Sequence, residues 1–155
     1  MYKIERVELM MVDLVPKVKR TDAIQSFVSQ QTPIVKIIDS DGVEGVGYSY
    51  TIGTGGSSVM SLLKDHLAPQ LIGRCPDNIE AIWLDLKLST NATFVGPITA
   101  LALAAIDTAL WDMKCKRAKL PLHVMAGGAT DKVKLYTTEG GWLHIEKEKL
   151  VEDAL

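Results

Sequence analysis

The chain has 155 residues, of which 47% are hydrophobic and 23% are charged, and its formal net charge at pH 7 is −2. This composition is ordinary for a globular protein with one good core and argues against disorder. The small negative charge, with no long basic run outside helix ends and one loop, argues against a nucleic-acid partner. No stretch reaches the roughly 20 apolar residues that span a bilayer, and the start of the chain lacks a secretory signal. We therefore expect a cytoplasmic protein with no membrane partner, whose Cys75 and Cys115 are free thiols.

The first third of the chain predicts β-structure. Partly alternating or β-branched segments indicate strands over residues 3–14, 33–39 and 43–50, separated by a polar loop over 16–31. Asp41-Gly42 is a strong hairpin signal between the second and third strands. These strands should form an antiparallel three-stranded meander.

Two helical segments follow a glycine-rich stretch. The first should begin near Ser57 or Ser58 as N-cap and should end or bend at Pro69. In the second, Asp77 and Glu80 have the spacing of a capping box. The buried face of this second helix is predicted to consist of Ile79, Ile82, Trp83 and Leu86.

The segment from Gly96 to Gly128 is the most informative part of the chain. Pro97 suits the first helical turn, and a core-facing stripe follows at helical spacing. The stripe consists of Leu103, Ile106, Leu110 and Met113. Asp107 and Asp112 are separated by about 140° of helical rotation, so we expect them to have architectural roles and not to converge on one ligand.

After a connector the pattern becomes extended again. Residues 132–138 predict a strand, Gly140-Gly141 a loop, and residues 146–155 a helix. One strand and one helix cannot bury their own apolar faces, so this part of the chain should belong to a domain that needs more units.

Local motifs do not define a metal site or a catalytic site. His66, His123 and His144 are widely separated and fit no H-E-x-x-H pattern. Residues 53–58 could cradle an anion, but they lack the G-K-[ST] ending of a phosphate loop, and a flexible loop explains them better. The loop containing Lys17, Lys19, Arg20 and Asp22 could pair with a carboxylate substrate or could simply be solvated. Residues 137–139, at the end of the last predicted strand, could face a ligand or form an ordinary turn.

Two segments, DGVEGVGYSY and AIDTALWDMKCKRAKLPLHVMAGG, carry a resemblance to a known family. The chain resembles the mandelate racemase and muconate lactonizing enzyme family of the enolase superfamily. The segment VKLYTTEGGWLH further resembles the first barrel strand of the acid-sugar dehydratase branch, which includes the galactarate and talarate dehydratases. The resemblance implies an α+β fold. Residues 1–128 would form an enolase-like N-terminal capping domain, which contains the meander and a helical bundle. Residues 129–155 would form the first strand and helix of a truncated (β/α) TIM-type barrel.

The resemblance also implies an activity. Enzymes of this family abstract the proton α to a carboxylate, while Mg²⁺ bound by three carboxylates stabilises the enediolate intermediate. An acid-sugar dehydratase is the first expectation, and a racemase or cycloisomerase of the same family is the alternative. The catalytic base and metal ligands belong to later barrel strands beyond Leu155, so no catalytic or metal-binding residue is expected in this chain, and the 155 residues alone should be inactive.

Two loops, residues 16–26 and 50–57, match the capping-domain loops that close over a small carboxylic acid substrate. Substrate-binding residues implied by the resemblance are Lys17, Lys19, Arg20, Asp22, Tyr50, Thr51, Thr54 and Thr138. Galactarate and talarate dehydratases present lysine and arginine where this chain has Ile24, Ile52 and Gly53, which argues against a diacid sugar. We expect the complete protein to be a homo-oligomer. A hypothesis from another class is that these residues form a stand-alone, non-catalytic binding module.

Overall fold

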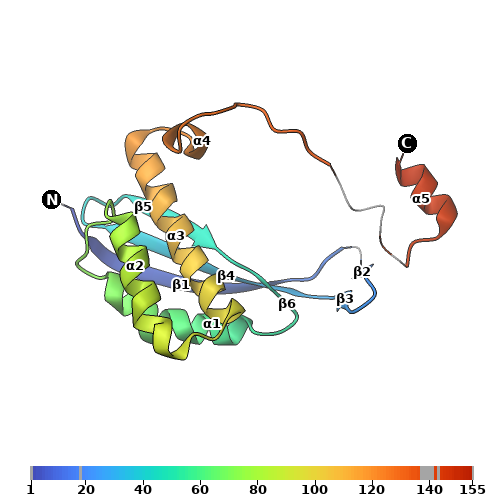
Figure 1. Ribbon diagram of the computed structural model, residues 1–155, viewed down its shortest axis with the longest axis horizontal. Coiled ribbons are helices and arrows are strands. Elements are labelled where there is room, and N and C mark those ends of the chain that lie inside the picture. The colour runs from blue at the N-terminus through green and yellow to red at the C-terminus, as the bar shows by residue number, and fades with distance from the viewer. Residues whose placement is uncertain (1, 18, 137–141, 143, 155) are drawn as a thin grey trace.

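The computed structural model describes residues 2–17, 19–136, 142 and 144–154. Its main sheet has the strand order β1-β4-β5, formed by β1 (Ile4–Leu14), β4 (Gln30–Asp39) and β5 (Glu44–Tyr48), and all its pairings are antiparallel. The predicted meander is therefore confirmed (Figure 1). A short strand, β6 (Thr51–Ile52), also pairs with β4.

The two faces of the sheet have different environments. Val35 and Ile37 of the central strand are fully buried beneath the helices, as their alternating spacing requires. Lys36 lies between them in sequence and points to the opposite face, where its ammonium group is 2.8 Å from a carboxylate oxygen of Glu44 and 4.0 Å from one of Glu8. One face of the sheet thus carries the core, and the other carries cross-strand ion pairs.

The helical elements are α1 (Gly56–Leu62), the π-helical turn η1 (Leu63–Leu67), the 3-10 turn η2 (Ala68–Leu71), α2 (Ile79–Thr90), the 3-10 turn η3 (Asn91–Thr93), α3 (Pro97–Ala118), α4 (Leu122–Met125) and α5 (Lys147–Ala154). Helices α1, α2 and α3 cover the buried face of the sheet, whereas α4 follows the end of α3 and α5 lies apart from the sheet (Figure 1). The departure from α-helical geometry before and at Pro69 agrees with the predicted end or bend there. None of the helices in the described part of the chain is long and apolar enough to span a membrane.

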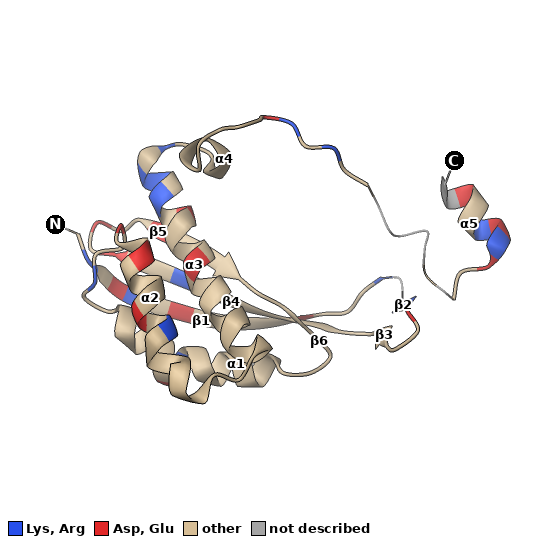
Figure 2. Cartoon of the chain, in the orientation of Figure 1, with Lys and Arg blue, Asp and Glu red and all other residues tan. Residues whose placement is uncertain are grey.

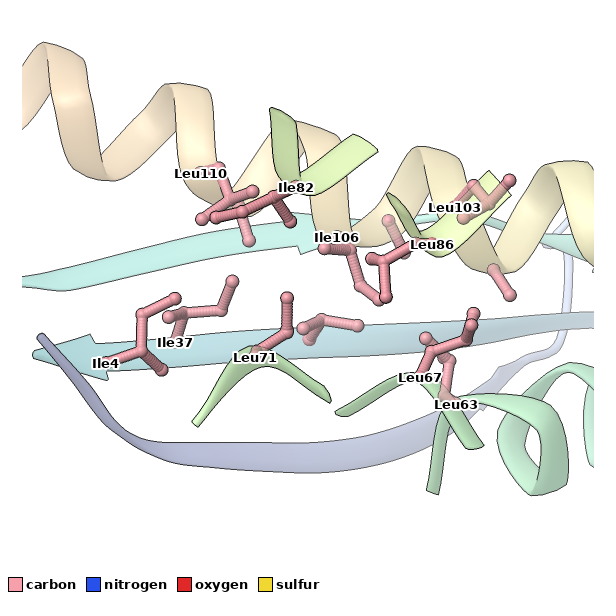
Figure 3. Close-up of a cluster of buried hydrophobic side chains, with 14 of the residues drawn as sticks. Ile4, Ile37, Leu63, Leu67, Leu71, Ile82, Leu86, Leu103, Ile106 and Leu110 are labelled. Atoms are coloured by element: carbon pink, nitrogen blue, oxygen red, sulfur yellow. The ribbon is translucent and has the colours of Figure 1, made fainter. Parts of the chain in front are cut away.

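The core lies between α3 and the sheet, and the side chains in Figure 3 come from every layer. The stripe predicted on the long helix is confirmed, because Leu103, Ile106, Leu110 and Met113 are all buried. Full burial of one such side chain contributes roughly 1.5–3 kcal/mol. The stripe is therefore a main reason that α3 lies across the sheet.

Three local predictions about helices α1 and α2 are wrong. The N-cap of α1 is Gly55, at φ 92°, a left-handed conformation that glycine adopts without steric cost. The capping box of α2 does not form, because Asp77 instead accepts a hydrogen bond from the Tyr2 hydroxyl. Trp83 is 37% exposed, with the Lys87 ammonium 4.8 Å from its ring centroid, since Ile79, Ile82 and Leu86 occupy the buried stripe.

Outside this core, the chain departs from the predicted elements at two places. The polar loop over 16–31 contains a small hairpin, β2 (Arg20–Thr21) with β3 (Ser26–Phe27). The predicted strand over 132–138 does not form over 132–136, where Val133, Leu135 and Tyr136 are 76%, 90% and 90% exposed. A strand requires a neighbour for its backbone hydrogen bonds, and the described residues offer none there. The predicted helix at the end of the chain is present as α5.

Candidate functional site at one end of the sheet

The two segments predicted to contact substrate leave the sheet at the same end. Hairpin β2–β3 runs directly into β4, and the chain after β5 returns to pair with the start of β4 as β6. Gln30 is opposite Ile52 and Gln31 is opposite Thr51 in this pairing. Figure 1 shows β2, β3 and β6 together at the end of the molecule away from α4. The sheet therefore brings together two loops that are separate in the sequence.

Gln31 ties the second loop to the sheet. Its side-chain oxygen Oε1 accepts a hydrogen bond from the Gly56 backbone N–H at 3.0 Å and another from the Thr51 hydroxyl at 3.3 Å. A Cβ atom at position 56 would lie 2.5 Å from the same oxygen and 2.8 Å from the Gln31 Cβ, which cannot rotate away, so the close approach requires glycine. Sequence reasoning missed Gln31, because a single glutamine in a strand has no motif around it.

The first loop is organised by Asp22. One carboxylate oxygen, Oδ1, accepts hydrogen bonds from the backbone N–H groups of Ile24 and Gln25, both at 2.8 Å, and these bonds lower the pKa of the carboxyl group. The Thr21 and Ser26 hydroxyl oxygens lie 3.1 Å apart across the hairpin. The hairpin is therefore held by contacts within itself, and Asp22 has an observed structural role.

Three cationic side chains lie on the way into this hairpin. Lys17 and Lys19 are exposed, and Arg20 is half-buried. Figure 2 shows basic residues in the segment that leads from β1 into β2, and an acidic residue at the turn between β2 and β3. The Arg20 guanidinium carbon is 5.8 Å from the ring centroid of Trp142, which also contacts Phe27 edge to face at 5.5 Å. Trp142 and Phe27 are two further residues that sequence reasoning did not single out.

The predicted site residues of the second loop differ in their exposure to solvent. Tyr50 is 50% exposed and Thr54 is exposed, so both side chains can meet a ligand. Thr51 is buried and its hydroxyl is bonded to Gln31, so its visible role is to fix the loop. Thr138 lies outside the described residues.

Asp107 and Asp112 on α3 both border a cavity of about 330 Å³. The angle of about 140° between them on the helix did not predict that they would share a cavity. Asp112 Oδ2 accepts a hydrogen bond from the Val46 backbone N–H at 2.7 Å and is 2.6 Å from the Lys116 ammonium. This architectural role was predicted. Asp107 has a pKa raised by burial and by the charge of Glu80.

The described residues do not provide a metal centre. Nowhere in that part of the chain do three or more His, Cys, Asp or Glu side chains gather in a way that could hold an ion. This end of the molecule offers positive charge, hydroxyl groups and two anchored loops, which suit the binding and orientation of an anionic ligand.

The chain is similar in sequence to proteins of one known family. Residues 6–127 match the family model for the mandelate racemase / muconate lactonizing enzyme N-terminal domain. The L-talarate/galactarate dehydratase of Salmonella typhimurium strain LT2 is 36% identical over 122 residues, which is 79% of this chain and 30% of the relative. The 3,6-anhydro-α-L-galactonate cycloisomerase of Streptomyces coelicolor is 37% identical over 102 residues, covering 66% of this chain and 28% of the relative.

Solved structures agree over almost the whole chain. A crystal structure of the Salmonella typhimurium LT2 dehydratase, liganded with Mg and L-lyxarohydroxamate, superposes with a TM-score of 0.92 and 32% identity over 99% of this chain and 40% of that one. The chain thus spans about a third of the length of these relatives. Since the family model covers most of the residues and the fold agrees, the chain belongs to the mandelate racemase / muconate lactonizing enzyme family.

Proposed function

We propose that this chain is the N-terminal part of a Mg²⁺-dependent enzyme that abstracts the proton α to a carboxylate, most specifically an acid-sugar dehydratase. Residues 1–128 would be the capping domain, and residues 129–155 would begin the barrel. The observation that carries the proposal is the family match over 6–127, with two anchored loops at one end of the sheet. The named relatives include a dehydratase and a cycloisomerase, so a cycloisomerase or racemase is the second candidate.

The residues of this chain would bind and orient the substrate. Lys17, Lys19 and Arg20 can form charge-assisted hydrogen bonds to a carboxylate, and Arg can do so with two parallel N–H donors. Tyr50 and Thr54 can donate or accept hydrogen bonds with sugar hydroxyls from the second loop. Closing both loops would also exclude water from the reacting carbon.

The reacting groups would come from elsewhere. Mg²⁺ is present in the Salmonella typhimurium dehydratase structure, whereas the described residues of this chain contain no ligand cluster for it. When bound, the metal would stabilise negative charge on the substrate carboxylate. Its ligands and the catalytic base are proposed to lie on barrel strands beyond Leu155.

The test is to express the reading frame extended past Leu155 and to incubate the product with Mg²⁺ and a library of acid sugars, hydroxy acids and lactones. Loss of one water per turnover supports the dehydratase, and an epimer or a cyclised product supports the second candidate. A stable, soluble monomer formed by the 155 residues alone, with no activity in the extended protein, would favour a stand-alone binding module. The exposed Val133, Leu135 and Tyr136 argue against that module, because they would favour aggregation.

A further inference from the structure

The face of the sheet that carries the cross-strand ion pairs also carries an exposed apolar patch, whereas α1, α2 and α3 cover the other face (Figure 1). Residues that pair directly in an antiparallel sheet point to the same face. Val46 pairs with Lys36, and the next residue of β4 on that face, Ile34, pairs with Met10 on one side and Tyr48 on the other. The exposed apolar side chains of this face, which we call the outer patch, are Met10 (51%), Val12, Leu14, Val46 and Tyr48 (61%).

The outer patch is large enough to mark an interaction surface. Its side chains together present apolar surface on the order of 400 Å², which is within the size range of the functional patches found on monomers. Two such faces packed against each other would bury roughly 1,200 Å² in total, the lower end of the range for specific interfaces. Two sheets pack face to face about 10 Å apart with their strands nearly aligned, so a second sheet is a suitable occupant.

The charges of this face favour a second copy of the same chain. Along the strands the face divides into two halves, because the outer patch lies towards the loops and the ion pairs lie towards the β4–β5 turn. Two cations and two anions make up these ion pairs, so a copy of the face would not be repelled by net charge. They are Arg6, Glu8, Lys36 and Glu44.

The division into halves also selects the symmetry of the pair. A twofold axis parallel to β4 would lay apolar half on apolar half, with β1 of one protomer over β5 of its partner. Arg6 and Glu44 lie in one row of the sheet, since both pair with Ile38, so this axis would set Arg6 over Glu44 of the partner subunit. An axis perpendicular to the strands would instead lay charged residues on the outer patch, which would leave them desolvated.

We propose that the outer patch is a dimer interface, at which two copies of this chain pack sheet against sheet about a twofold axis parallel to β4. The dimer would bury the outer patch and would extend the Arg6–Glu8 and Lys36–Glu44 ion pairs, with N–O distances of 2.9 and 2.8 Å, into a network across the interface. Since this axis preserves strand direction, the candidate substrate loops of both copies would leave the dimer at the same end. The interface does not depend on the proposed function.

Sedimentation velocity of the full chain at increasing micromolar concentrations should show a monomer–dimer equilibrium. Tyr48→Glu places a charge inside the interface and should raise the dimer Kd about tenfold or more. Leu88→Glu is the matched control, because Leu88 is 60% exposed on α2, outside this face, and should leave the Kd unchanged. Circular dichroism checks that each variant is folded. A chain that stays monomeric, or a Kd indifferent to Tyr48→Glu, would overturn the interface.

Arg6→Glu and Glu44→Arg test the proposed axis. Each variant alone sets like charges against each other at two places in its dimer and should raise the Kd about fivefold. In a mixed dimer of the two variants, opposite charges meet at both places, so an equimolar mixture should associate about as tightly as the parent chain. A mixture that associates no more tightly than either variant would refute the axis, and with it the proposed packing.

The same variants in the extended protein cover the case in which the 155 residues aggregate. There the parent and Leu88→Glu should share one oligomeric mass, and Tyr48→Glu should have at most half that mass. A mass unchanged by Tyr48→Glu would overturn the interface. A monomeric extended protein in which hydrogen exchange shows β1 and β5 protected would assign this face to later residues of the same chain, and would overturn the dimer as well.

Discussion

Replacing Gly47 by alanine should strongly destabilise the domain, because this glycine lets β5 touch the backbone of α3. A Cβ atom at position 47 would lie 2.1 Å from the Ala105 carbonyl oxygen and 2.4 Å from the Ala109 nitrogen. Ordinary contact begins at 3.4 Å, so the helix would have to retreat by about 1.3 Å. Both obstacles are backbone atoms, and no side-chain rotation can relieve them.

A shift of that size would loosen the whole buried stripe of α3 against the sheet. Overpacking of a core typically costs 1–3 kcal/mol, and a clash with rigid backbone belongs at the upper end, so we expect a loss of about 3 kcal/mol in the free energy of unfolding. For a domain whose total stability is about 5–15 kcal/mol, this is a large fraction. Urea unfolding followed by circular dichroism measures the change.

Gly42→Ala is the matched control. Gly42 has a φ of 79°, yet a Cβ there would meet nothing within 4 Å. Its cost should be the backbone penalty alone, about 1–2 kcal/mol. If Gly47→Ala costs no more than Gly42→Ala, the close approach of α3 and β5 is not what the glycine provides, and the reasoning fails.

Three further predictions concern carboxylates. Asp112→Ala removes the acceptor of the exposed Val46 N–H and should cost about 0.5–1.5 kcal/mol in urea unfolding, whereas Asp112→Asn, which keeps an acceptor oxygen, should cost less. The pKa of Asp22 is lowered, so its stabilisation of the hairpin should be complete above its ordinary pKa of 3.8 and should disappear as the pH falls through the lowered pKa. Exchange rates of the hairpin amides, measured against pH, would show this loss. Asp22→Ala should abolish the pH dependence. The pKa of Asp107 is raised, so its negative charge should reduce the stability of the fold progressively as the pH rises above 3.8. Asp107→Asn should therefore be more stable than the parent chain at pH 7 and equally stable at pH 3. Equal stability of the two at pH 7 would refute the raised pKa.

Sequence patterns predicted best those elements in which many residues follow the same helical or alternating spacing. The long helix carries a stripe of four buried side chains at helical spacing, and the meander has alternating strands with an Asp-Gly turn. Each pattern is set by local geometry and by burial, which act on every residue of the element. The predicted capping box failed because the N-cap of α2 is Asn78, one residue later than predicted. The carboxylate of Asp77 instead accepts a hydrogen bond from the hydroxyl of Tyr2, far away in the chain.

The candidate site was only partly predictable, because several of its contacts join single residues that are far apart in the sequence. The cationic loop was visible as Lys17, Lys19 and Arg20, but its partner Trp142 is more than a hundred residues away in the sequence. Gln31 could not be recognised either, because its importance comes from the β4–β6 pairing, which brings Thr51 beside it. Contacts between distant single residues leave no periodic trace in a sequence.

At the end of the domain opposite the loops, a partly buried cluster of charged side chains stabilises the fold. Asp39 is buried; its Oδ1 accepts hydrogen bonds from the Asp41 and Val43 backbone N–H groups, and its carboxylate also pairs with Arg117 at the end of α3. The guanidinium of Arg117 reaches Asp41 at 3.0 Å and covers the ring of Tyr2 with its central carbon 3.5 Å from the ring centroid.

This cluster joins the N-terminal segment, the β4–β5 turn and α3. A buried ion pair is costly to break from one side, since the remaining charge is left without a partner. Local opening should therefore be rare at this end, whereas the hairpin at the other end is tied down by a few exposed contacts. The domain thus combines a rigid base, which fixes where the two loops leave the sheet, with loops that can change position at a lower cost in free energy than the base can.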